Sequence, residues 1–256
     1  MKLSKYIVIL TLLFAFFSCN DNKKNVDIAS DKEVQNPESS IKVVPISHGT
    51  LILETDKEVI YIDPTGGKKA FEGQKSPTLV LITDIHGDHL SKSTLEALNL
   101  TEVPVVAPKA VTDKIPTTIS PKTVTINNGD SYTHNAIKIE AIPMYNLREE
   151  ALKFHTKGRG NGYVLNIGNE RIYISGDTED IPEMRNLINI DLAFVCMNLP
   201  YTMPVESAAS AVLEFKPKTV YPYHYRGTDG LSDVNLFKSM VNKEDKSINV
   251  QLLKWY

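Results

Sequence analysis

The stretch of residues 79–90, LVLITDIHGDHL, constrains the fold and the chemistry of this chain more than any other segment. Its first half is a run of apolar and β-branched residues, which is typical of a strand buried on both faces. Its second half places four charged or metal-binding side chains within six positions, around a tight turn at Gly87: Asp84, His86, Asp88 and His89. Imidazole and carboxylate groups are ligands for zinc, iron and manganese. The segment therefore predicts either a polar turn after a strand or a metal site.

Short β-rich runs dominate the chain from residue 41 onward. Strands are predicted over residues 41–46, 50–54, 59–63, 78–83, 103–107, 122–126, 136–142, 162–167, 171–175 and 218–221. Helices are predicted over residues 91–100, where Ser93 and Glu96 have capping-box spacing, over the amphipathic segment 204–216, and over 233–241. Two sheets covered by helices on their outer faces satisfy this order. We therefore expect one α/β domain over residues 41–256.

The N-terminus has the pattern of an export signal. A basic start, MKLSK, precedes the apolar run YIVILTLLFAFF, which is too short to span a bilayer as a helix. Ser18 and Cys19 follow, and a small residue before a cysteine resembles the lipobox of bacterial lipoproteins. We expect residues 1–18 to be a lipoprotein-type signal peptide and Cys19 to be the lipidated first residue of the mature chain. The alternative is a short N-terminal membrane anchor.

The segment 19–40 predicts a flexible tether, because its polar, mixed-charge composition cannot bury a core. Together with the signal, it predicts an exported, lipid-anchored cell-envelope protein, either periplasmic or in the outer membrane, that contacts the membrane through its N-terminal lipid. The formal net charge of −3 gives no indication of a nucleic-acid partner. With Cys19 lipidated, Cys196 has no cysteine partner, and its apolar surroundings LAFVCM predict a packed core residue.

Two further segments place polar residues after predicted strands. Asp177 lies in ISGDT and His224 lies in VYPYHYRG. Together with His86, Asp88, His89 and His155, these pieces resemble the metallo-β-lactamase fold superfamily, whose motif is His-x-His-x-Asp-His, then a single His, then Gly-Asp-Thr, then a final His. The opening VVPISHGTLILE…VIYIDP resembles the branch of ascorbate-6-phosphate lactonase and N-acylphosphatidylethanolamine phospholipase D.

The resemblance implies a four-layer αββα sandwich of two mixed β-sheets flanked by helices. It also implies a hydrolase with two divalent metal ions, which are zinc, manganese or iron. Position 84, His86 and His155 would hold one ion, Asp88, His89 and His224 the other, and Asp177 would bridge them. Asp88 and Asp177 are the implied catalytic residues, with a metal-bound hydroxide as the nucleophile.

Position 84 departs from the family motif, because Asp84 stands where the family has its first histidine. One interpretation is a decayed site that keeps the fold without the chemistry. The other is a hard oxygen ligand that replaces nitrogen and favours manganese or iron over zinc. The remaining motif positions are intact, which favours a working site.

Several residues near the motif are candidates for supporting roles. Asp63, at a strand end, either orients a histidine ligand or caps a turn. His48 either lines the pocket or is an ordinary loop residue, whereas His134 lies in a polar turn and predicts no role. The basic segment KGRGNG, residues 157–162, either receives an anionic group or is a flexible loop. Possible substrate contacts are Tyr145, Tyr201 and Tyr225.

These features predict a metal-dependent hydrolase that cleaves an ester, lactone or phosphodiester bond in a small molecule. Both an anionic and an uncharged substrate agree with this prediction. Two alternatives are a β-lactamase and a non-catalytic metal- or ligand-binding lipoprotein with a decayed site. Against the first stands Asp177, at a position where many such lactamases have a cysteine.

Overall fold

The computed structural model describes residues 34–35 and 39–256. The predicted signal peptide, Cys19 and most of the predicted tether lie outside these residues. The first sheet runs in chain order and comprises β1 (Val34–Gln35), β2 (Lys42–Ser47), β3 (Thr50–Glu54), β4 (Val59–Ile62), β5 (Leu79–Leu81), β6 (Val105–Ala107) and β7 (Thr123–Thr125). Its pairs are antiparallel from β1 to β4 and parallel from β4 to β7.

The second sheet has the order β16-β13-β12-β11-β10-β9-β8. Its strands are β8 (Ser131–His134), β9 (Ile137–Met144), β10 (Gly160–Ile167), β11 (Glu170–Ile174), β12 (Leu192–Cys196), β13 (Thr219–Tyr223) and β16 (Asn249–Val250). The pairs from β8 to β11 are antiparallel and those from β11 to β16 are parallel. A small separate hairpin joins β14 (Arg226–Gly227) to β15 (Gly230–Leu231).

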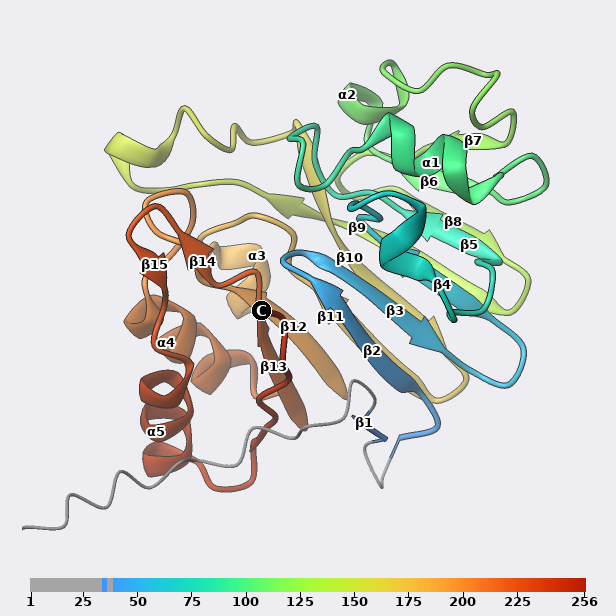
Figure 1. Ribbon diagram of the computed structural model, residues 1–256. Coiled ribbons are helices and arrows are strands. Elements are labelled where there is room, and N and C mark those ends of the chain that lie inside the picture. The colour runs from blue at the N-terminus through green and yellow to red at the C-terminus, as the bar shows by residue number, and fades with distance from the viewer. Residues whose placement is uncertain (1–33, 36–38) are drawn as a thin grey trace, which may run out of the picture.

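Helices flank the two sheets on opposite sides (Figure 1). Beside the first sheet lie η1 (Lys68–Phe71), α1 (Lys92–Leu98) and α2 (Lys109–Thr112), and beside the second lie α3 (Pro182–Arg185), α4 (Val205–Phe215) and α5 (Val234–Glu244). A short turn, η2 (Glu149–Ala151), interrupts the loop between β9 and β10. The predicted four-layer αββα architecture is confirmed. Within residues 39–256, no helix combines the length and the apolar character that crossing a bilayer requires.

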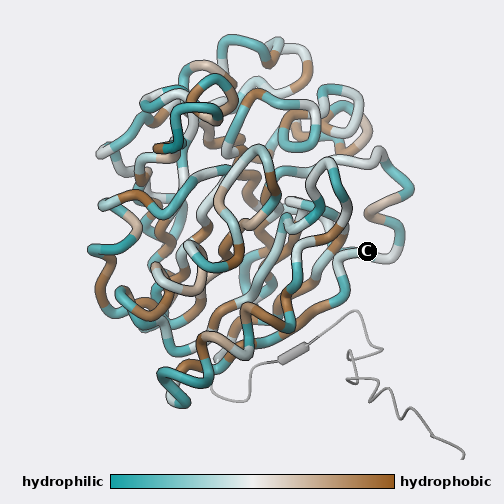
Figure 2. Tube along the Cα trace, turned by 90° about the vertical axis from the view of Figure 1, so that its left-hand side faces the viewer, coloured by the Kyte–Doolittle hydropathy of each residue, from teal (hydrophilic) through white to brown (hydrophobic). Residues whose placement is uncertain are grey.

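The alternation of side chains along the first sheet explains this layering. Leu51 and Leu53 of β3 pack in the core between the sheets, whereas Ile52 packs in the separate core under the helices. The same division separates Ile62 from Tyr61 in β4. Each fully buried aliphatic side chain contributes about 1.5–3 kcal/mol relative to exposure. Figure 2 shows hydrophobic and hydrophilic stretches alternating along the trace, with many hydrophilic stretches in the outer loops.

The structure corrects two local predictions. The N-cap of α1 is Ser91, whose Oγ accepts from the backbone N–H of Thr94 at 3.3 Å, so the predicted Ser93–Glu96 capping box is wrong. The segment 192–196 forms β12, a central strand that was not predicted. Cys196 lies at its end and is fully buried, as predicted. Burial raises the pKa of its thiol to about 12, so it is not a reactive nucleophile.

Parallel pairing brings the ends of four strands to one edge of the molecule. Asp63 follows β4, and Asp84 follows β5 in the same sheet. Asp177 follows β11, and His224 follows β13 in the other sheet. The carboxyl ends of parallel strands are where open α/β folds form their sites.

Ser39 and Ser40, at the start of the domain, bind Glu170 at the amino end of β11. The backbone N–H of Ser40 donates to Oε1 of Glu170 at 2.9 Å, and Ser39 Oγ donates to its Oε2. The chain therefore enters the domain at the end of β11 opposite to Asp177.

Candidate metal centre

The segment after β5 forms the predicted tight turn. The backbone N–H groups of His89 and Leu90 both donate to the carbonyl of His86, at 3.0 and 2.8 Å. Asp84 and His89 are fully buried, whereas the side chains of His86 and Asp88 are about 40% exposed. The turn thus directs two side chains inward and two toward a cavity.

Four side chains from three strand ends converge on one point. His89 Nε2 lies 3.3 Å from Asp177 Oδ2 and 3.2 Å from His224 Nε2. His224 Nε2 lies 3.4 Å from both Asp177 Oδ1 and Asp88 Oδ2. Ligands placed tetrahedrally at 2.0–2.1 Å around zinc stand roughly 3.3 Å apart. The spacing of these donor atoms fits a bound divalent ion.

Asp63 fixes the orientation of His89. Its Oδ2 lies 2.8 Å from His89 Nδ1, and the same carboxylate accepts from the backbone N–H and the hydroxyl of Thr83 at 2.7 and 2.6 Å. All three residues are fully buried. With Nδ1–H donated to Asp63, His89 Nε2 faces the cluster and can bind a metal ion once it has lost its own proton. This is the geometry of a carboxylate that orients a metal-binding histidine.

Three buried polar atoms at the cluster lack a hydrogen-bond partner: Asp177 Oδ1, His155 Nε2 and His224 Nδ1. His155 Nδ1 lies 3.0 Å from the carbonyl of Tyr201, to which it donates, so its Nε2 carries the lone pair. That atom faces Asp177 Oδ2 at 3.2 Å. Buried acceptors without a donor are costly, and a cation among them removes the cost.

The negative charge of Asp177 and the positive charges of the neighbouring histidines stabilise one another. Burial tends to raise the pKa of Asp177, but His224 and His89 outweigh burial and hold this pKa well below its ordinary value. Burial tends to lower the pKa of His89, but Asp177 and Asp63 outweigh it and raise this pKa well above its ordinary value. The carboxylate of Asp177 is therefore ionised at neutral pH, as a metal ligand must be.

Asp84 is bound by an arginine. Arg159 donates from Nε to Asp84 Oδ1 at 3.0 Å and from Nη2 to Asp84 Oδ2 at 2.8 Å. Its Nη2 also donates to the carbonyl of Phe154 at 2.6 Å. His86 Nδ1 lies 2.9 Å from Asp84 Oδ2. The sequence pattern of residues 157–162 predicts either a segment that receives an anionic group or a flexible loop, and it does not indicate that Arg159 pairs with Asp84.

The other supporting candidates divide into two groups. His48 reaches the cluster, with Nε2 3.2 Å from Asp88 Oδ2 and its ring 3.8 Å from that of His224. Tyr225 packs on Tyr256 and does not line the cavity described below, and Tyr145 donates to Glu183 instead. Lys157 also binds Glu183, at 2.8 Å.

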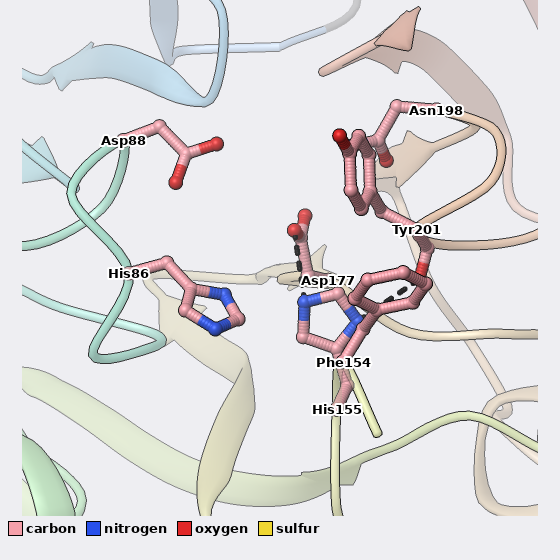
Figure 3. Close-up of a pocket in the computed structure, with 7 residues that line it drawn as sticks. All are labelled: His86, Asp88, Phe154, His155, Asp177, Asn198 and Tyr201. Carbon is pink, nitrogen blue, oxygen red and sulfur yellow. Dashed lines mark hydrogen bonds and ion pairs between the residues drawn. The ribbon is translucent and has the colours of Figure 1, made fainter. Parts of the chain in front are cut away.

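A cavity of about 310 Å³ opens over the cluster, a size suited to a small molecule. In Figure 3, the side chains of His86, Asp88, His155 and Asp177 point toward its interior. Phe154 and Tyr201 form an aromatic wall, with ring centroids 5.0 Å apart in an edge-to-face arrangement. Asn198 completes the lining. Of these, the sequence analysis missed Phe154 and Asn198, which lie in loops without a recognisable motif.

Comparison with known proteins agrees with this geometry. Residues 42–224 match the family model of the β-lactamase superfamily domain. A metal-dependent hydrolase of the UPF0173 group from Pyrococcus abyssi is 28% identical over 219 residues, which cover 81% of this chain and 95% of the relative. A similar relative from Ruegeria is 26% identical and covers 80% and 99% of the two chains.

Solved structures show the same fold. A protein from Parabacteroides distasonis, described as a metal-dependent hydrolase, is 36% identical with a TM-score of 0.74, covering 84% of this chain and 94% of that one. Igni18, a metallo hydrolase from Ignicoccus hospitalis, has a TM-score of 0.71 at 22% identity and covers 84% and 96%. The resemblance to the lactonase and phospholipase D branch stays a prediction. The chain belongs to the β-lactamase superfamily, among the metal-dependent hydrolases of this fold.

Proposed function

We propose that this protein hydrolyses an ester or lactone bond of a small molecule with a divalent metal ion held by Asp88, His89, Asp177 and His224. The observation that carries this proposal is the spacing of the four donor groups. His89 Nε2 and His224 Nε2 lie 3.2 Å apart, and each lies 3.3–3.4 Å from a carboxylate oxygen of Asp177 or Asp88. When bound, such an ion supplies Lewis acidity and activates a water molecule near neutral pH.

The protein's own residues prepare the site for this chemistry. Asp177 stays ionised between His89 and His224, and Asp63 holds His89 in the tautomer that a metal ligand needs. His86 and His155 also project into the cavity (Figure 3), where they can contact a bound substrate. Asp63, His89, His155 and Asp177 are buried and held by polar contacts, so they need little rearrangement when substrate binds.

The lining of the cavity supports a neutral substrate with an apolar or aromatic group. Phe154 and Tyr201 offer an aromatic surface beside the polar cluster. Lys and Arg do not occur among the seven lining residues. The cations of the segment 157–162 are engaged, Lys157 by Glu183 and Arg159 by Asp84. This favours an ester or lactone over an anionic phosphodiester.

We also propose that the protein is exported and anchored to the cell envelope by a lipid on Cys19. The support is the sequence pattern alone, namely the short apolar run that ends at Ser18 and Cys19 and the polar segment that follows.

A substrate screen tests the proposed activity. The purified protein is stripped with a chelator, reloaded with zinc or manganese, and assayed with aryl esters, lactones, a phosphodiester and a β-lactam. We expect metal-dependent turnover of an ester or lactone, and loss of it in Asp177→Asn and His224→Ala. His134→Ala is the control, because His134 lies away from the cluster, beside Glu58. Turnover of the β-lactam or the phosphodiester alone would replace the proposed substrate class. A protein that binds metal without turnover of any substrate would favour a binding lipoprotein.

A further inference from the structure

The two halves of the candidate metal centre differ in how their donor atoms are used. In the half formed by Asp88, His89 and His224, the donor atoms face one another and Asp177. In the half formed by Asp84, His86 and His155, protein groups already occupy most of the donor atoms.

Asp84 is the residue in this second half whose metal-binding atoms are already bound by other protein groups. Both of its carboxylate oxygens accept from the guanidinium of Arg159, at 3.0 and 2.8 Å, and Oδ2 also lies 2.9 Å from His86 Nδ1. The side chain of Asp84 is fully buried and that of Arg159 is 20% exposed, so solvent screens the ion pair little. A planar, bidentate pair of this kind is strong and geometrically specific.

The ligand atoms of Asp84, His86 and His155 lie within 4.8 Å of one another, but the guanidinium of Arg159 already binds both oxygens of Asp84. Without Asp84, a second ion would depend on His155 Nε2, on Nε2 of the partly exposed His86, and on Asp177, which the other half shares. Protein metal sites take three or four protein donors, so this half stands at the lower limit. In addition, Arg159 Nη2 lies 3.5 Å from His86 Nε2, which places a permanent cation beside any second ion.

We propose that this site holds one metal ion, bound by Asp88, His89, Asp177 and His224, and that the guanidinium of Arg159 supplies the positive charge in the half where the family motif predicts a second metal. The proposal rests on the metal dependence proposed above. Asp84 is then a partner of Arg159 and not a metal ligand. Arg159 acts as a positioning residue, because it fixes Asp84 and, through Asp84, His86.

Metal stoichiometry tests the proposal without any assay of activity. The metal-free protein is saturated with zinc, and separately with manganese, passed through a desalting column, and analysed by elemental analysis and native mass spectrometry. We expect one equivalent in the wild type, retention of that equivalent in His86→Ala, and its loss in His89→Ala and His224→Ala. Two equivalents in the wild type that fall to one in His86→Ala would overturn the proposal. A wild type that binds no metal would instead overturn the proposed function and this inference with it.

A gain of metal gives the opposite test. The double variant Asp84→His with Arg159→Met restores a histidine and removes the guanidinium, so we expect it to bind two equivalents. Arg185→Met is the matched control, because it removes an arginine whose partners are Asp180 and Glu214, and we expect it to keep one. A double variant that folds by circular dichroism and still binds one equivalent contradicts the role given to Arg159. If it does not fold, the comparison of His86→Ala with His224→Ala decides.

Discussion

Gly49 lies so close to the imidazole ring of His224 that a β-carbon at residue 49 would stand 2.7 Å from His224 Cδ2. The same β-carbon would lie 3.5 Å from His89 Cε1. A side chain at position 49 must therefore push His224 away from the other ligands. The absence of a side chain at this turn between β2 and β3 is part of the metal centre.

Gly49→Ala is expected to weaken metal binding by about tenfold or more, because displaced ligands lose their tetrahedral spacing. The melting temperature of the metal-free protein should change little. Titration with a chromophoric chelator measures the affinity. Gly87→Ala is the control: it lies in the motif loop, but a β-carbon there meets no atom within 4 Å. Equal affinities for both variants would show that His224 moves freely.

Asp63→Asn is expected to lower metal affinity by about 10- to 100-fold, the usual effect of removing a carboxylate behind a histidine ligand. The backbone at residue 63 has φ of 45°, a conformation that Asn tolerates, so the fold should persist. Chelator competition and circular dichroism on the same preparation check this. Unchanged affinity would reduce Asp63 to a turn cap.

Phe154→Ala is expected to raise KM for an aryl ester by about tenfold and to change kcat less, because the aromatic wall binds the ground state and the transition state alike. Phe154→Leu should restore part of the affinity. Steady-state kinetics with an aryl and a methyl ester separate the effects. A loss confined to kcat would place Phe154 in the chemical step instead.

Glu58 makes stability depend on pH at a site remote from the metal centre. Burial tends to raise its pKa, but hydrogen bonds from Thr78 and Asn135 outweigh burial and lower the pKa below its ordinary value near 4.5. The folded state thus disfavours protonation, so the stabilisation is present above about pH 4.5 and is lost as the pH falls through the folded-state pKa.

Glu58→Gln should therefore lower the free energy of unfolding by about 1 kcal/mol at pH 7. The difference from the wild type should shrink as the pH falls below about 4.5 and through the lowered pKa of folded Glu58, beneath which both side chains are neutral. Urea unfolding of the two metal-free proteins across this range is the measurement. A difference that is constant with pH would assign the effect to packing.

Cys19→Ala tests the proposed anchor. The variant should leave the membrane fraction or accumulate as an uncleaved precursor, because the lipid attachment site is gone. Membrane fractionation and intact mass identify the outcome. Unchanged fractionation with unchanged mass would contradict lipidation of Cys19. Cys196→Ala is the control, since Cys196 is buried in the core.

Local sequence patterns predicted the positions of those strands that a short apolar run alone identifies. The strand 50–54 appears as predicted, and the strands predicted over 162–167 and 171–175 appear as β10 and β11, because short apolar runs are local features. The strand β12 escaped prediction, because a continuous apolar run has no period that separates strand from buried helix. The cap of α1 was misplaced by two residues, since serines at 91 and 93 satisfy the same local pattern.

The sequence predicted those candidate site residues that directly follow a strand. His89, Asp177 and His224 follow strands whose parallel pairing brings them together. The pairing of Asp84 with Arg159 was not predictable, because 75 residues separate them and Arg159 lies in a loop whose course no pattern determines. Sequence motifs therefore identified the candidate ligands that the fold brings together, but not the arginine that binds Asp84.

The anchoring of the domain's first residues on Glu170 has a consequence for orientation. Glu170 begins β11 and Asp177 follows its end, so the point of entry of the chain and the metal centre lie roughly 20 Å apart at opposite poles of one strand. With a lipid on Cys19, the predicted tether would join the domain at the pole that carries Ser40, away from the metal centre. The attachment to the membrane would then leave the mouth of the cavity unobstructed, so that substrates can arrive from the aqueous compartment.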